Sequence, residues 1–130
     1  MTYQHAIVWL DHREAKVIDF SIDHKHVVGI ENLDAPRKIH RKAGIIGDGH
    51  EGNDRLFYDE VVKALGTARE VVIAGPGLAK NEFKRHIDAK HAGMAKRVVG
   101  VESMDHPSEG ELLSYARKYF KRVDALRGDV

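Results

Sequence analysis

The sequence contains no cysteine, which excludes disulfides, thiolate metal ligands and a cysteine nucleophile. It also lacks an apolar run near the roughly 18 residues of a membrane-spanning helix, and its start, MTYQHAIVWL, has neither the basic residues nor the long apolar stretch of a secretory signal. We therefore expect a cytoplasmic protein with no membrane partner. Its 130 residues, 42% of them hydrophobic, suffice for a single domain over 1–130 with one core.

Charge is distributed unevenly along the chain, although the formal net charge is only +1. Residues 1–34 hold six acids against three bases, so the remaining residues carry a net charge of +4. Within them, PRKIHRK (36–42) surrounds one histidine with four cations, and segment 80–97 holds six bases against two acids. Clustered cations either contact a polyanion or form a solvated face. The polyanion would be favoured if the two runs met in space.

Hydrophobic patterns predict five strands and three helices. HAIVWL (5–10) is almost continuously apolar, as in a strand buried on both faces, and AKVIDF (15–20) and HVVGIE (26–31) read as two further strands of an antiparallel meander. The basic, glycine-containing residues at about 35–53 predict a long loop, and such loops are usually functional or disordered. A helix from Asn53, a strand EVVIAG (70–75), a helix through Phe83 and Ile87, and a strand RVVGVE (97–102) follow.

The last predicted helix has the clearest signals. Ser108 and Glu111 form a capping-box pattern after Pro107, and an apolar stripe continues to Leu126. Placing the fourth strand parallel to the first gives an α/β fold with a mixed five-stranded sheet in the order 3-2-1-4-5, strand 2 being antiparallel. Right-handed crossovers put two helices on one face, so the last helix must cover the other. The predicted fold is a ribonuclease-H-like α/β sandwich.

The turn Gly75-Pro76-Gly77 joins a strand to a helix and allows two interpretations. A helix N-terminus offers free N–H groups to a phosphate, and Lys80 lies one turn further on. However, Pro76 lacks an N–H donor, and the segment lacks the lysine-serine ending of a nucleotide-binding loop. Glycines in such turns more often satisfy steric demands, which favours a structural role for the turn.

The segment VVIAGPGLAKNEFKRHI (71–87) resembles the middle domain of Pelota and the archaeo-eukaryotic peptide-chain release factors, in which a Gly-Pro-Gly turn precedes a lysine and a phenylalanine. VWLDHREAKV (8–17) resembles the first hairpin of that domain, and the basic loop falls where the family has its functional loop. The sequence is most similar to stand-alone bacterial relatives of this domain, called translational machinery proteins. The resemblance implies a translation-associated protein that binds the ribosome or tRNA and needs no cofactor.

Peptide release is not expected, because release factors present a Gly-Gly-Gln tripeptide in this loop and the single glutamine here is Gln4. The nearest equivalent is the segment 47–50, Gly-Asp-Gly-His. The resemblance instead implies phosphate-directed, salt-sensitive RNA contacts without catalysis. The residues that we expect to make these contacts are Arg37, Lys38, His40, Arg41, Lys42, His50, Lys80, Lys84 and Arg85.

Two other function classes stay open. A metal-dependent ribonuclease-H-like hydrolase would use Asp11 with loop acids, namely Asp48, Glu51 and Asp54; RNA cleavage that needs a divalent ion and is lost in Asp11→Ala would support it. A non-catalytic homo-oligomeric scaffold would pair the basic runs with the acidic N-terminal third of a neighbour, and its assembly would collapse at high salt. None of the nine histidines matches a known ligand spacing, so we expect no metal site.

Overall fold

A computed structural model describes residues 4–32 and 46–126, and the side chains of 46–53 fall outside that description. The strands are β1 (His5–Leu10), β2 (Glu14–Phe20), β3 (Lys25–Glu31), β4 (Glu70–Gly75) and β5 (Val98–Ser103). The helices are α2 (Ile46–Leu65), α3 (Ala79–Lys90), α4 (Ala92–Ala95) and α5 (Glu109–Leu126). Among the described residues, no helix is both long and apolar enough to cross a membrane.

The five strands form one mixed sheet in the order β3-β2-β1-β4-β5, as predicted. β2 is antiparallel to both β1 and β3, whereas β4 is parallel to β1 and β5. β1 is therefore central, which explains why its sequence is apolar on both faces. Parallel pairing of β1 and β4 also brings the turns that follow these two strands to the same edge of the sheet.

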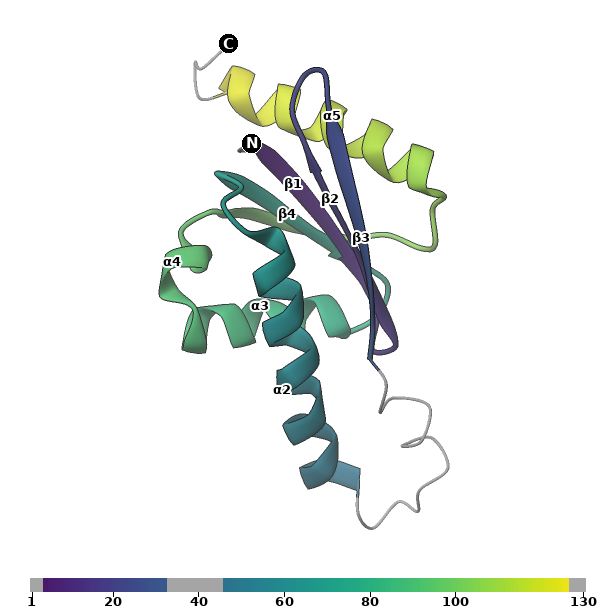
Figure 1. Cartoon of the computed structure of the whole chain (residues 1–130), viewed down its shortest axis with the longest axis vertical. Coiled ribbons are helices and arrows are strands. Elements are labelled where there is room, and N and C mark those ends of the chain that lie inside the picture. The colour runs from purple at the N-terminus through teal and green to yellow at the C-terminus, as the bar shows by residue number, and fades with distance from the viewer. Residues whose placement is uncertain (1–3, 33–45, 127–130) are drawn as a thin grey trace.

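Helices cover both faces of the sheet, with α2 and α3 on one side and α5 on the other (Figure 1). Successive residues of β1 belong alternately to two hydrophobic cores, one on each face of the sheet. Val8 and Leu10 pack with α2 and α3, while Ile7 and Trp9 pack with α5. The predicted capping box of α5 is confirmed. The backbone N–H of Glu111 donates to Ser108 Oγ over 3.1 Å, and the N–H of Ser108 donates to Glu111 Oε1 over 2.9 Å.

Two helical segments differ from the sequence-based expectation. α2 begins at Ile46, so residues 46–53, predicted as loop, are helical, and this part of α2 extends past the end of β3 (Figure 1). Glycine disfavours a helix by about 1 kcal/mol relative to alanine, but extending a helix that is already packed adds a hydrogen bond with each residue. The second difference is α4, which was not predicted because four residues carry no periodic signal.

Candidate functional site

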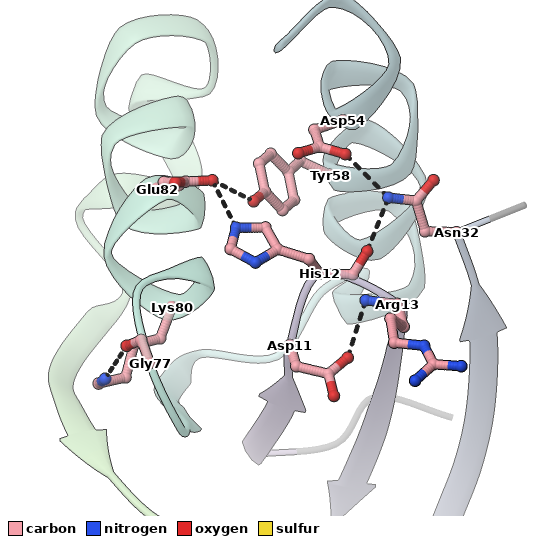
Figure 2. Close-up of polar contacts among 9 residues, drawn as sticks. All are labelled: Asp11, His12, Arg13, Asn32, Asp54, Tyr58, Gly77, Lys80 and Glu82. Atoms are coloured by element: carbon pink, nitrogen blue, oxygen red, sulfur yellow. Dashed lines mark hydrogen bonds and ion pairs between the residues drawn. The ribbon is translucent and has the colours of Figure 1, made fainter. Parts of the chain in front are cut away.

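A buried polar contact joins the end of β3 to α2, on either side of segment 33–45 (Figure 2). The side-chain amide of Asn32 donates to Asp54 Oδ1 over 2.8 Å and to the backbone carbonyl of His12 over 2.9 Å. Asn32 and Asp54 are both buried. A hydrogen bond shielded from water in this way holds its partners in a defined geometry. The residues before and after the predicted basic loop are thus fixed to each other and to the β1–β2 turn.

A second contact fixes α3 to the same place. The ring Nε2 of His12 lies 2.9 Å from Glu82 Oε1, and the hydroxyl of Tyr58 donates to the same oxygen over 3.1 Å. Burial is the largest cause that raises the pKa of Tyr58, and the carboxylates of Glu82 and Asp54 add to it. Tyr58 therefore stays a neutral donor throughout the physiological pH range. The β1–β2 turn, α2 and α3 meet at this carboxylate (Figure 2).

Asp11 supports the turn between β1 and β2. Its Oδ1 accepts hydrogen bonds from the backbone N–H groups of Arg13, over 2.8 Å, and Glu14, over 3.0 Å. A short polar side chain that caps backbone donors in this way stabilises a turn. Three clusters of His, Asp and Glu ligand atoms occur within the described part of the chain, and Asp11 is in none of them. The geometry thus gives Asp11 a structural role in this turn.

The glycine turn after β4 is shaped by close backbone contact. Gly75 has φ 154°, and a Cβ atom there would lie 2.1 Å from the backbone oxygen of Leu10 on β1. Gly77 has φ 61°, the left-handed region that glycine occupies readily, but a Cβ atom added there would point into open space. The ammonium of Lys80 donates to the carbonyl of Gly77. These contacts support the structural interpretation of the turn.

Most residues predicted to contact RNA lie outside the part of the chain that the structure describes. The cationic segment is not described, which concerns Arg37, Lys38, His40, Arg41 and Lys42. The side chains at the start of α2 are not described either, which concerns the predicted site residue His50 and two acids of the hydrolase hypothesis, Asp48 and Glu51. Their proposed roles stay predictions. The structure defines the residues that come before and after the cationic segment.

The three predicted contact residues on α3 have different surroundings. Lys80 is buried against the glycine turn. Lys84 is half-buried and forms an ion pair with Asp88, with Nζ 2.8 Å from each carboxylate oxygen. Arg85 is exposed. Of these three side chains, Arg85 is therefore the one most available to a phosphate.

Sequence reasoning did not identify His12, Asn32 and Glu82 as members of one site. They come from a turn, a strand end and a helix, and no local spacing connects them. One signal was present: Asn32 is a polar residue directly after an apolar strand, and the predicted strand order places that strand end beside the β1–β2 turn. Their association depends on tertiary structure.

The chain was compared with known proteins in sequence and in fold. No family model matches it. It is 35% identical over 51 residues to a Pelota homologue of Methanococcus aeolicus, covering 38% of this chain and 14% of that protein. It is also 35% identical over 52 residues to the Pelota homologue of Methanococcus vannielii, covering 39% and 15%. Over this stretch the chain is Pelota-like in sequence.

Solved structures show the Pelota-like fold over most of the chain. The Thermoplasma acidophilum Pelota protein matches with a TM-score of 0.59 at 17% identity, covering 87% of this chain and 32% of that one. Archaeoglobus fulgidus Pelota gives 0.57 at 17%, covering 98% and 41%. An archaeal translation termination factor gives 0.55 at 17%, covering 95% and 39%. The Pelota-like chain therefore corresponds to a part of each of these larger proteins.

Proposed function

We propose that this Pelota-like domain acts in translation as a non-catalytic RNA-binding protein of the cytoplasm. Its similarity to Pelota and to a translation termination factor supports a translation-related role. The contact of Asn32 with Asp54 carries the proposal further, because it fixes the start and end of the connection that holds the cationic segment. Ribosomal RNA or tRNA is the partner that suits a cationic surface in such a protein.

The RNA contact is assigned to the four cations of segment 37–42 and to Arg85 on α3. A long basic segment anchored at both ends can follow an irregular phosphate backbone without reading its sequence. Contacts of this kind release counterions, and four of them give a slope of about −3 when log K for single-stranded RNA is plotted against log salt. Peptide release is not proposed, since the chain has no Gly-Gly-Gln tripeptide.

Cosedimentation with ribosomal particles on gradients at low and moderate salt tests this function. Four loop cations, Arg37, Lys38, Arg41 and Lys42, are changed together to Glu. We expect the wild-type chain to migrate with a ribosomal fraction and the variant to stay at the top. The matched control changes four cations outside this surface to Glu, namely Lys96, Lys118, Lys121 and Arg122, which are all exposed.

The control shifts the net charge by the same amount as the loop variant, so a specific loop contact predicts that it still cosediments. Equal loss in both variants would mean that only overall charge matters. A wild-type chain that never enters a ribosomal fraction, at any salt, would contradict the proposed function. The Pelota-like similarity would then report on the fold alone.

A further inference from the structure

We propose that Asp59, His86 and His91 form a binding site for a divalent transition-metal ion such as Zn²⁺, at the junction of α2 with the C-terminal end of α3. None of these three residues is among those proposed to contact RNA, so the proposal does not depend on RNA binding. No metal site was expected from the sequence, because none of the nine histidines matches a known ligand spacing.

Two imidazole rings converge on one carboxylate oxygen. His86 Nε2 lies 2.6 Å from Asp59 Oδ1, and His91 Nε2 lies 2.9 Å from the same atom. The ligand atoms of all three side chains lie within 4.8 Å of one another. Ligands of a tetrahedral Zn²⁺ are about 2.0–2.1 Å from the ion and so about 3.3 Å from each other. Separating the carboxylate oxygen from each ring nitrogen by less than about 1 Å would bring these two distances to that spacing.

The surrounding structure holds the histidines and leaves the carboxylate adjustable. The side chain of His86 is only 7% exposed and packs against the ring of Tyr58, with ring centroids 5.6 Å apart. His91 ends α3, where its backbone N–H donates to the carbonyl of Ile87 over 2.8 Å. The side chain of Asp59 is 50% exposed, so it can swing outward as a metal enters. Solvent on that side can supply the remaining ligand as water.

The ligand types select the class of metal. Two imidazoles with one carboxylate suit Zn²⁺, Co²⁺, Ni²⁺ or Cu²⁺, whereas Mg²⁺ and Ca²⁺ prefer oxygen ligands. The other two ligand clusters in the described part of the chain contain one histidine and two carboxylates each. On binding, each ring that holds its proton on Nε2 shifts that proton to Nδ1, or releases it to solvent if both nitrogens are protonated.

Without metal, the same three side chains form a hydrogen-bonded bridge between α2 and α3, and one substitution separates the two roles. The amide oxygen in Asp59→Asn can still accept from both rings, but it is neutral and a much poorer ligand for Zn²⁺. We therefore expect Asp59→Asn to keep the fold and to lose the metal. His86→Gln and His91→Gln remove one imidazole each.

The test is titration of the full chain, without a polyhistidine tag and freed of metal, with Zn²⁺ by calorimetry, and with Co²⁺ by visible absorption. We expect one tight equivalent and the intense band of four-coordinate Co²⁺. The affinity should fall at least about tenfold in each of the three variants, since even groups that only support metal ligands typically contribute this much. Thermal unfolding without metal verifies that each variant is folded.

His24→Gln and His26→Gln are the matched controls, because both remove an exposed histidine from the β2–β3 hairpin. They should keep the tight equivalent and the Co²⁺ band. Absence of a tight equivalent in the wild-type chain would overturn the proposal. So would a tight equivalent that survives Asp59→Asn and both variants of the cluster, because it would lie at other residues.

Discussion

Substituting alanine for each of the two glycines in the turn after β4 should lower the free energy of unfolding by very different amounts. In Gly75→Ala the added Cβ would lie 2.1 Å from the backbone oxygen of Leu10, in the neighbouring parallel strand. Neither atom belongs to a flexible side chain, so β1 and β4 must separate at their ends. Forced overpacking typically costs about 1–3 kcal/mol, and an unfavourable backbone angle adds about 1–2 kcal/mol.

For Gly77→Ala only the backbone angle contributes, since open space surrounds the glycine. We expect this variant to lose about 1–2 kcal/mol and Gly75→Ala to lose about 2–5 kcal/mol of unfolding free energy. The two substitutions add the same methyl group two residues apart, so each serves as the control for the other. The corresponding decreases in Tm are roughly 3–8 °C for Gly77→Ala and 6–20 °C for Gly75→Ala.

Urea denaturation followed by circular dichroism measures both free energies, and equal m-values would show that the unfolded states are comparable. Similar losses in the two variants would refute the steric argument. A loss below about 1 kcal/mol in Gly75→Ala would refute it as well, because it would mean that the strands separate easily.

Three further changes test other parts of the structure. Burial raises the pKa of Asp19 on β2 to about 6, despite the nearby His26, and its side chain is only 10% exposed. A pKa above the unfolded value means that protonation stabilises the fold, so about 2–3 kcal/mol of unfolding free energy is lost as pH rises from 4 to 7. Asp19→Asn should remove this pH dependence. In urea denaturation at pH 7.5 this variant should be more stable than the wild-type chain. Tyr58→Phe deletes one donor to Glu82 and should cost about 1–2 kcal/mol, and a variant as stable as wild type would show that this bond has no net effect. Ser108→Ala removes the N-terminal cap of α5 and should cost about 1 kcal/mol in thermal unfolding, whereas Ser108→Asp should retain most of the stability.

The strand order followed from the sequence because the apolar patterns and the right-handed crossover rule allowed few arrangements. The capping box was also predictable, since its two residues lie three positions apart in the sequence. The contacts around Glu82 and the cluster at Asp59 were not, because their members come from separate elements. The early start of α2 escaped prediction for another reason: the glycines near its beginning disfavour a helix locally. Local rules therefore gave the scaffold, and tertiary packing determined the sites.

The hydrogen bond of Asn32 with Asp54 bears on how this protein can change over evolution. For a connection whose ends are already held together, doubling the length adds only about 0.6 kcal/mol of closure entropy. Residues can therefore be inserted, removed or exchanged between these two anchors while the sheet and its helices keep their stability. Selection can then vary the composition of the connection independently of selection for folding.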